Sequence, residues 1–153
     1  MGLDIVTNRK AFRDYEILEK FEAGISLLGT EVKSLRSGRV DLLGSYAKVE
    51  KGGVLLLDAT IQVYEKASHE THDPKRPRPL LLNRFEIDRL AEQTLRKGLA
   101  IPVLRMYWKK GRVKVELGLG RGKHAADQRQ DLKKKAEQRD TDREIARFKQ
   151  GKR

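Results

Sequence analysis

The chain has 153 residues and carries 34 lysines and arginines against 22 acidic residues, a net charge of +12. A chain of this length suits one domain with an appendage, and a positive charge this large attracts polyanions, so nucleic acid is the expected partner. The absence of cysteine excludes disulfide frameworks, thiolate nucleophiles and cysteine-ligated zinc.

The N-terminal residues 1–10 are too polar for a signal peptide, because Asp4, Asn8, Arg9 and Lys10 interrupt a short apolar stretch. Elsewhere no run approaches the ~20 apolar residues of a membrane span. The sequence therefore predicts a cytoplasmic protein that makes no contact with a membrane.

Strand-like alternation begins at Tyr15, which forms one mostly apolar face with Ile17, Glu19 and Phe21. Gly24 then predicts a bend or a bulge. Further strands are expected over residues 46–50, 54–57, 61–64, 100–108 and 112–119.

Two short glycine turns, at residues 51–53 and 109–111, are expected to close hairpins between these strands. The second hairpin has the clearer pattern. Its last strand places one set of side chains toward a core and the other toward solvent. The inward set is Val113, Val115, Leu117 and Leu119, and the outward set is Arg112, Lys114 and Glu116.

Two helices are predicted among the strands. The stronger spans residues 84–97, with Asn83 as its N-cap, Glu86 completing a capping box and Gly98 ending it. The other spans residues 30–37. In this helix Val32 and Leu35 are expected to face a core, whereas Glu31, Lys33, Ser34 and Arg36 are expected on the surface.

The loop from Ser68 to Pro79 alternates prolines with Lys75, Arg76 and Arg78. Proline stiffens the backbone and cannot donate a hydrogen bond to a neighbouring strand. We therefore expect this loop to avoid regular pairing and to present its cations outward.

These elements predict a mainly β fold with inserted helices: a small antiparallel OB-like barrel over residues 1–120 with about three helices in the chain. Residues 121–153 form a basic tail with 12 basic and 6 acidic residues and few large apolar side chains. Such a segment cannot build its own core. We expect it to be disordered in the free protein and to become helical when RNA neutralises its cations.

Three patterns suggest chemistry, but none meets its requirements. Glu22 and Glu31 have no histidine, nucleophile or orienting group at an interpretable spacing, although a metal-dependent ribonuclease using both stays an alternative. The segment from His69 to Asp73 lacks the spacing of a helical metal site, and a solvated loop is favoured. Residues 118–124 fail the phosphate-loop pattern, and a flexible exit from the last strand that contacts an RNA backbone is preferred. No catalytic residue, metal, cofactor or small-molecule substrate is expected.

Basic residues outside the tail occur in clusters that could contact phosphates. Aromatic residues make up only 6% of the chain and fit a core better than a base-stacking platform. The pattern therefore favours recognition of a folded RNA by its shape and backbone. The clusters are Asn8, Arg9 and Lys10, then Lys33 with Arg36, then Lys75, Arg76 and Arg78.

Two adjoining stretches, Phe21-Glu22-Ala23-Gly24-Ile25 and Leu28-Gly29-Thr30-Glu31-Val32-Lys33-Ser34-Leu35-Arg36, resemble the signature of the small protein B family, also called SsrA-binding protein. Shorter matches extend the resemblance over nearly the whole chain. They include Asn8-Arg9-Lys10-Ala11, Ser45-Tyr46-Ala47, Asp73-Pro74-Lys75-Arg76, Leu80-Leu81-Leu82, Leu117-Gly118 and Gly122-Lys123.

The resemblance implies an OB-like barrel that binds the tRNA-like domain of tmRNA and, together with elongation factor Tu, delivers it to stalled ribosomes. It also implies roles in tmRNA binding for Glu22 and Lys114, and we add Glu31 from the signature to the candidate RNA-binding residues. A ribosomal or ribosome-assembly protein that binds ribosomal RNA stays an alternative.

By the same resemblance, the tail lies in the decoding centre and the empty mRNA path of the stalled ribosome. At residues 126–129 the chain reads Ala-Asp-Gln-Arg, where the family commonly has His or Tyr before Asp-Lys-Arg. The expected ribosome-binding residues are Arg121, Gly122, Lys123, His124, Asp127, Arg129, Lys133, Lys134, Arg143 and Arg147.

Overall fold

The computed structural model describes residues 3–63, 72–123, 136–139 and 143. The chain divides into two units, Met1–Gly122 and Lys123–Arg153. In the second unit, the described residues 136–139 and 143 are helical. The predicted disorder of the free tail concerns residues that lie mostly outside the described ranges and stays a prediction. Within those ranges no helix has the length and apolarity needed to cross a membrane.

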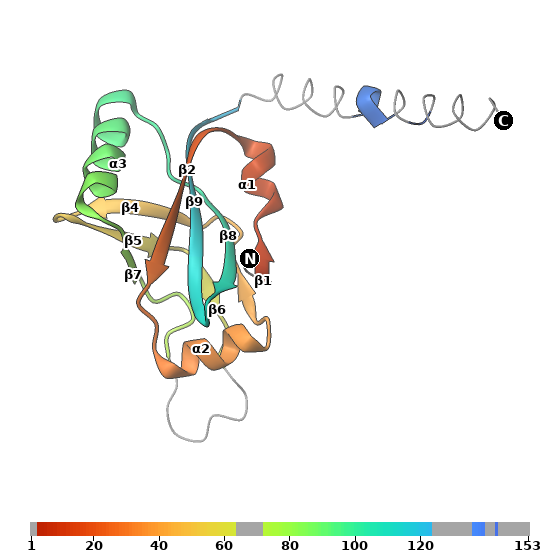
Figure 1. Ribbon diagram of the computed structural model, residues 1–153, viewed down its shortest axis with the longest axis vertical. Helices are drawn as coiled ribbons and strands as arrows, with labels where there is room; N and C mark the ends of the chain where they lie inside the picture. The colour runs from red at the N-terminus through yellow and green to blue at the C-terminus, as the bar shows by residue number, and fades with distance from the viewer. Residues whose placement is uncertain (1–2, 64–71, 124–135, 140–142, 144–153) are drawn as a thin grey trace. The chain divides into compact units, whose positions relative to one another are not determined.

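The first unit consists of nine strands and three helices within the described residues (Figure 1). In chain order they are β1 (Leu3–Thr7), α1 (Arg9–Asp14), β2 (Tyr15–Ile25), α2 (Gly29–Arg36), β3 (Val40–Asp41), β4 (Tyr46–Glu50), β5 (Gly53–Leu57), β6 (Thr60–Ile61), β7 (Arg78–Leu81), α3 (Arg84–Lys97), β8 (Val103–Lys109) and β9 (Arg112–Gly122).

Seven strands form one antiparallel sheet in the order β1-β8-β9-β2-β7-β5-β4, and β3 pairs with β6. The sheet closes on itself because β4, at one edge, bonds to the chain that enters β8. The amide of Ala47 donates to the carbonyl of Ile101 at 2.8 Å, and that of Val103 donates to the carbonyl of Ser45 at 3.3 Å. Closure leaves few unpaired strand edges, and this mainly β fold with inserted helices confirms the predicted fold class.

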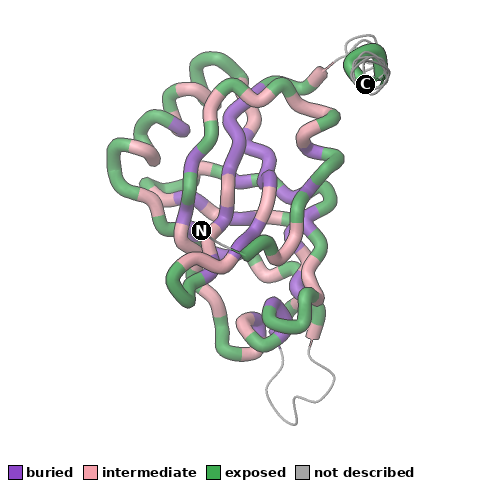
Figure 2. The backbone as a smooth tube through the Cα atoms, turned by 45° about the vertical axis from the view of Figure 1, so that its right-hand side comes forward, coloured by how far each residue is buried: buried purple, intermediate pink, exposed green. Residues whose placement is uncertain are grey.

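The core lies inside the barrel and follows the predicted alternation of the long strands (Figure 2). Val113, Val115, Leu117 and Leu119 of β9 are all buried, as predicted. Opposite them, β2 contributes Phe21. Burying side chains of this size stabilises the fold by about 1.5–3 kcal/mol each, so the β2–β9 pair supplies a large part of the core.

Both predicted hairpin turns form, and they share one backbone geometry. Lys51 and Gly52 join β4 to β5 with φ of 49° and 77°, and Lys110 and Gly111 join β8 to β9 with φ of 52° and 73°. Two successive positive φ values are the requirement of a type I′ turn, whose twist matches that of the flanking strands. In each turn glycine occupies the second position without steric cost.

Helix α3 confirms its predicted boundaries and caps. The Asn83 side chain accepts from the amide of Glu86 at 2.9 Å, and the Glu86 carboxylate accepts from the amide of Asn83 at 3.3 Å. Gly98 ends the helix in the left-handed region with φ of 65°, as is common at helix C-termini.

Helix α2 forms as predicted, but its buried face differs from the prediction. Glu31 and Ser34 are fully buried together with Leu35, whereas Val32 is only partly buried. The expectation that Glu31 and Ser34 lie on the surface is therefore wrong. Glu31 is buried because two arginines from the 72–78 segment reach it.

The strand β7 contradicts the expectation that the proline-rich segment avoids regular pairing. Pro79 pairs with Leu55 of β5, and its carbonyl accepts from the amide of Ser26 at 2.9 Å. Proline lacks only its own amide hydrogen, so Pro79 removes one donor from the ladder while its carbonyl still accepts.

Three further elements, β1, α1 and β3, have no counterpart in the sequence-based prediction. Strand β1 pairs with β8, and α1 is a single short helix capped by Asn8. The strand predicted over residues 61–64 is displaced, since β6 covers Thr60–Ile61.

A β-bulge bends β2, but at Leu18 rather than at Gly24. The register of β2 against β9 shifts between Ile17 and Glu19, whereas Gly24 pairs regularly with Lys114. The absence of a side chain at Gly24 admits Leu81, whose Cβ would lie 3.2 Å from a Cβ built there.

The bulge explains the glycines near the end of β9. A Cβ on Gly120 would overlap the carbonyl oxygen of Glu16, and one on Gly118 would lie 3.0 Å from Cδ1 of Ile17. Residues 118–122 belong to strand β9, in which Gly120 needs the close approach of the β2 backbone, and the flexible exit predicted there is wrong.

Gly120→Ala is expected to lower the free energy of unfolding by about 1–3 kcal/mol, because the new methyl group must displace the β2 backbone at the bulge. Urea denaturation of the purified variant measures this loss. Gly122→Ala is the matched control, since a Cβ there meets nothing within 4 Å. Equal stability of the two variants would contradict this account of the bulge.

Candidate nucleic-acid interface

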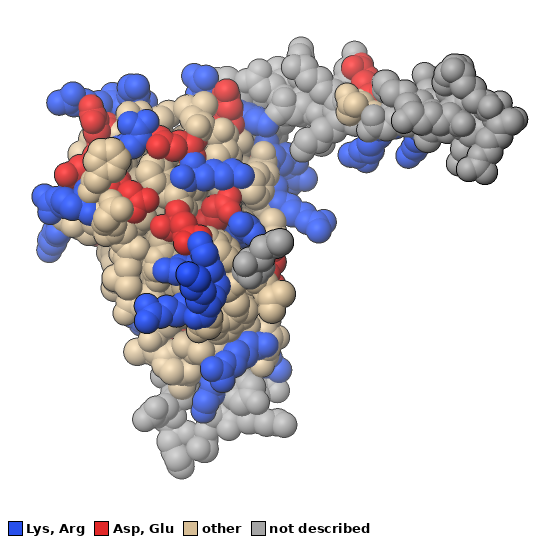
Figure 3. Space-filling view, viewed as in Figure 1, with Lys and Arg blue, Asp and Glu red and all other residues tan. Residues whose placement is uncertain are grey.

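The outer face of β1, β8, β9 and β2 carries a dense set of charged side chains (Figure 3). Because side chains alternate along a strand, the residues between the buried ones on β9 point outward. Lys114 and Glu116 occupy this outer face, and Lys20 and Glu22 of β2 lie on it beside them. This face presents both predicted tmRNA-binding residues, Glu22 and Lys114.

Glu22 is held by two donors from β8. The Tyr107 hydroxyl donates a short hydrogen bond to one carboxylate oxygen, and Nζ of Lys109 lies 3.1 and 3.2 Å from the two oxygens. The hydrogen bond from Tyr107, aided by Lys109 and Lys114 and opposed by burial, holds the pKa of Glu22 below its usual value of 4.5. The carboxylate is therefore ionised at neutral pH.

Tyr107 is itself fixed from several sides. Its ring is buried, and the guanidinium of Arg105 stacks over it at 4.5 Å. Burial, reinforced by the Glu22 carboxylate, raises the pKa of the Tyr107 phenol above its usual range, so the hydroxyl stays protonated and keeps donating to Glu22.

Glu22 and Glu116 are direct cross-strand partners, an arrangement that is destabilising for like charges unless cations separate them. Glu116 is neutralised by Arg105 at 2.5 Å and by Lys20 at 3.4 Å, while Lys109 pairs with Glu22. Arg105 also reaches Asp4 of β1 at 2.7 Å. These ion pairs neutralise the carboxylates of Glu22, Glu116 and Asp4.

Beside Glu22 lies a shallow hollow of about 440 Å³ at the β8–β9 turn. It is lined by Glu22 and by four cations: Lys109, Lys110, Arg112 and Lys114. Lys110 and Arg112 are exposed, and among the described residues neither forms an ion pair. A hollow with this excess of positive charge suits the phosphates of a nucleic acid.

An apolar hollow of about 330 Å³ adjoins it and shares Arg112 and Lys114. Its wall includes Trp108 and Leu81, and the Leu81 side chain is 62% exposed. The two hollows together offer cations beside an apolar surface, an arrangement that suits an RNA backbone with a sugar or base against it.

Sequence reasoning missed Lys109, Lys110 and Arg112 as part of this site. The signal was present, because three cations surround the glycine of the second hairpin turn. The sequence pattern indicates only a turn at Lys109 and Lys110 and an outward side chain at Arg112. Leu81 gave no comparable signal, since its exposure depends on the pairing of β7.

Three predicted RNA-binding residues, Glu31, Arg76 and Arg78, form one cluster instead, in which only Arg76 is partly exposed. Glu31 and Arg78 are fully buried, and Arg78 Nε donates to Glu31 at 2.5 Å. Arg76 Nη2 donates to the other carboxylate oxygen at 2.6 Å. The prediction that this loop presents its cations outward is therefore wrong for Arg78, and neither Arg78 nor Glu31 can touch an RNA directly.

Most polar atoms of the cluster have hydrogen-bond partners, but the buried Nε of Arg76 has none among the described residues. Arg78 also donates to the carbonyls of Ala59 and Pro74 at 3.0 Å each, and the Leu28 amide donates to Glu31 at 2.8 Å. Burial alone would raise the pKa of Glu31, but hydrogen bonds from Arg76, Leu28 and Arg78 outweigh it and lower that pKa below 4.5. The cluster joins α2 to the segment that leads into β7.

His72 contradicts the prediction of a solvated loop at its own position. It is 7% exposed, with Nδ1 3.0 Å from the Thr30 hydroxyl and Nε2 2.8 Å from the Ile61 carbonyl. Its neighbour His69 lies outside the described residues. Among the described residues no group of three or more His, Asp or Glu side chains could hold a metal ion, and Glu22 and Glu31 belong to separate networks.

Asn8 is structural rather than exposed. Its side chain is buried and donates to the carbonyls of Leu42 and Val103 at 3.0 and 2.9 Å, and its oxygen accepts from the Ala11 amide. The side chain therefore caps α1 and joins three segments of the barrel, which contradicts a direct contact with RNA.

The other predicted residues are exposed or lie in the second unit. Arg9, Lys10, Lys33, Arg36 and Lys75 are exposed on the first unit. Arg121 and Gly122 end β9, where Arg121 Nε donates to Glu16 at 2.9 Å, and Lys123 follows. Arg143 is exposed and helical. The remaining tail residues, His124, Asp127, Arg129, Lys133, Lys134 and Arg147, lie outside the described residues.

Comparison with known proteins shows to which family the chain belongs. The family model described as "SmpB protein" matches residues 5–147. The chain belongs to the SmpB protein family. An SsrA-binding protein from Syntrophobacter fumaroxidans is 54% identical over 139 residues, covering 91% of this chain and 86% of the relative. Another, from Carboxydothermus hydrogenoformans, is 49% identical over 141 residues, covering 92% of each.

The fold of this SmpB-family chain also resembles a solved structure. A chain described under "tmRNA-SmpB: a journey to the center of the bacterial ribosome" superposes with a TM-score of 0.66 at 50% identity, covering 78% of this chain and 85% of that chain. These matches confirm the resemblance seen in the sequence. They do not favour a ribosome-assembly protein or a metal-dependent ribonuclease.

Glu31→Gln is expected to lower the free energy of unfolding by about 3–5 kcal/mol at pH 7, because it leaves the buried Arg78 and the partly exposed Arg76 without their anion. Urea denaturation measures the loss. The matched control is Glu16→Gln, which removes an exposed pair with Arg121 and is expected to cost no more than about 1 kcal/mol.

The effect of Glu31→Gln should also depend on pH. A lowered pKa in the folded state means that ionised Glu31 stabilises the fold above its ordinary pKa of 4.5, and that this stabilisation is lost as the pH falls through the folded-state pKa. The difference between the two proteins should therefore shrink in acid. A difference that stays constant would contradict the role of the ionised carboxylate.

Proposed function

We propose that this protein is an RNA-binding adaptor that binds the tRNA-like domain of tmRNA and brings it to stalled ribosomes for trans-translation. Elongation factor Tu takes part in the delivery, which occurs in the cytoplasm. The tail enters the decoding centre and the mRNA path. The protein makes and breaks no covalent bond and uses no cofactor, metal or small-molecule substrate.

The observation that carries the proposal is the cationic hollow at the β8–β9 turn, on a chain of the SmpB family. Its cations project from a tight turn and from strands of a closed barrel, so the backbone from which they project holds a fixed geometry. A fixed arrangement of cations can recognise the spacing of phosphates in a folded RNA. Relatives in the family carry the name SsrA-binding protein.

Glu22 acts in this site in a way that differs from its neighbours. A carboxylate is repelled by phosphate, but it accepts hydrogen bonds from 2′-hydroxyls and from the amino groups of bases. Glu22 also fixes the ammonium group of Lys109 beside the hollow. It therefore selects sugar or base edges, while Lys110, Arg112 and Lys114 bind phosphates.

Exposed cations elsewhere on the first unit extend the contact with RNA. These are Arg9, Lys10, Lys33, Arg36 and Lys75, each exposed to solvent. Asn8, Glu31, Arg76 and Arg78 support the site indirectly, since their hydrogen bonds position α1, α2 and the start of β7. In the tail, Arg121, Lys123, Arg143 and the other basic residues contact ribosomal RNA.

The test is a binding titration of the full chain against the tRNA-like domain of tmRNA, an ordinary tRNA and a ribosomal RNA hairpin, repeated over a range of salt concentrations. We expect selective binding of the tmRNA domain that persists at physiological salt. Counterion release makes any basic protein bind RNA at low ionic strength. Equal affinity for the three RNAs, lost together on adding salt, would refute the adaptor function.

The two hairpin turns provide matched variants for this titration. Lys110→Gln removes a cation from the hollow, and Lys51→Gln removes one from the same position of the same type of turn between β4 and β5. Lys110→Gln should weaken tmRNA binding and reduce the slope of log Kd against log salt by about 0.7–0.9, the effect of one phosphate contact. Lys51→Gln should change neither quantity.

The tail is expected to act separately from the barrel. Deleting residues 126–153 should leave binding to the tRNA-like domain within about threefold of the full chain, because the phosphate-binding cations of the barrel remain. The same deletion should abolish peptide tagging on stalled ribosomes in a reconstituted translation reaction. A parallel loss of both activities would show that the division of roles is wrong.

A further inference from the structure

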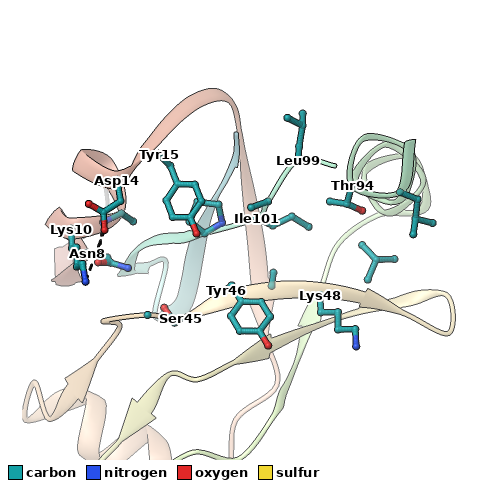
Figure 4. Close-up of a pocket in the computed structure, with 17 residues that line it drawn as sticks. Asn8, Lys10, Asp14, Tyr15, Ser45, Tyr46, Lys48, Thr94, Leu99 and Ile101 are labelled. Carbon is teal, nitrogen blue, oxygen red and sulfur yellow. Dashed lines mark hydrogen bonds and ion pairs between the residues drawn. The ribbon is translucent and has the colours of Figure 1, made fainter. Parts of the chain in front are cut away.

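A second concave site, lined entirely by described residues, lies away from the β8–β9 turn. It has a volume of about 600 Å³ and is bounded by α1, the start of β4, the last turn of α3 and residues 99–102 (Figure 4). Its lining residues include none of those that line the cationic hollow. The RNA-binding face described above does not account for it.

Two tyrosines enter this cavity from different strands. Tyr15 begins β2 and Tyr46 begins β4, and Figure 4 shows both rings in the space between α1 and the end of α3. Tyr46 is 40% exposed, and among the described residues neither hydroxyl has a hydrogen-bond partner. Leu99 and Ile101 complete an apolar wall. The cavity thus offers flat aromatic surface that the core does not use.

Charged groups stand at the edge of the same cavity. Lys48 extends outward from β4 and, within the described ranges, forms no ion pair. Lys10 lies on α1 with its ammonium group 4.0 Å from Asp14, a loose exposed pair. Two ammonium groups and a carboxylate therefore border the tyrosines.

We propose that this cavity binds a single unstacked RNA nucleotide, with its base against Tyr46 and Tyr15 and its phosphate on Lys48. Aromatic side chains bind any base through its π-face, and single-stranded RNA presents bases in this way. Asp14 accepts a hydrogen bond from an amino or imino group on the base edge. A purely apolar ligand would give the ammonium group of Lys48 no anion to bind.

The inference rests on the proposed function only in taking RNA as the ligand. The cationic hollow recognises backbone, whereas this cavity recognises one base. Both are built on the same barrel, so one molecule can hold a folded RNA at the β8–β9 turn and a single-stranded nucleotide at the other site. The nucleotide comes either from tmRNA or from ribosomal RNA.

The direct test is titration of the full chain with AMP, GMP, CMP and UMP, followed by NMR. We expect intermolecular NOEs between base protons and the Tyr46 ring, and weaker binding of ribose 5-phosphate, which lacks the base. Tyr46→Ala should weaken nucleotide binding roughly tenfold, whereas Tyr46→Phe keeps the ring and should bind as the native chain does. Ribose 5-phosphate binding as tightly as the nucleotides, or Tyr46→Ala binding normally, would overturn the proposal.

The phosphate contact has its own variant and control. Lys48→Gln should weaken binding of the monophosphates but not of the corresponding nucleosides, while Lys97→Gln, at the end of α3 and outside the lining, should change neither. Loss of nucleoside and nucleotide binding to the same extent in Lys48→Gln would exclude the assigned phosphate position.

The source of the nucleotide follows from two binding measurements on Tyr46→Ala, one with the tRNA-like domain of tmRNA and one with the small ribosomal subunit. The RNA whose affinity falls supplies the nucleotide, and no loss in either arm overturns the proposal. If the nucleotides fail to bind while tmRNA binding is intact, only the proposed nucleotide site in this cavity is refuted. Nucleotide binding without selective tmRNA binding would refute the adaptor function and leave the cavity assigned.

Discussion

The antiparallel pairing of β2 with β9 is the constraint on which the rest of the first unit depends. Its inner side chains supply much of the core, and its outer side chains include Glu22 and Lys114 of the candidate interface. One register serves both purposes, because a shift by one residue would exchange the two faces. The bulge at Leu18 and the bare backbone of Gly120 bend the pair so that the sheet can close.

The same register of β2 against β9 also determines which charged side chains are neighbours on the outer face. It places Glu22 opposite Glu116, and the repulsion is balanced by cations from β8 and β2. Once those pairs have formed, the positive charge that remains is concentrated around the β8–β9 turn. The position of the candidate interface is therefore a result of strand pairing as much as of the number of basic residues.

Features set by neighbours in sequence could be predicted, and features set by distant partners could not. The alternation of β9, the caps of α3 and the Lys-Gly turns are local, and the sequence predicted all three. Arg78 looked like a solvated loop cation because its anion, Glu31, lies 47 residues away. Asn8 looked like part of a basic cluster because its acceptors on Leu42 and Val103 come together only when the barrel closes. Family resemblance suggested Glu22 and Lys114, but only the fold shows that the cations of the β8–β9 turn line the same hollow as Glu22.

The Glu31–Arg76–Arg78 cluster affects how basic residues in this family can be assigned to roles. Replacing Arg78, which is fully buried, would disturb the packing of α2 and β7 and so alter the candidate interface without removing a phosphate contact. In a survey that neutralises each arginine in turn, such positions would be counted as ligands. An interface inferred from those losses would wrongly include residues of the protein interior. The charges of the three cluster residues depend on one another, so we expect a replacement at one position to be tolerated only when the other two are replaced as well.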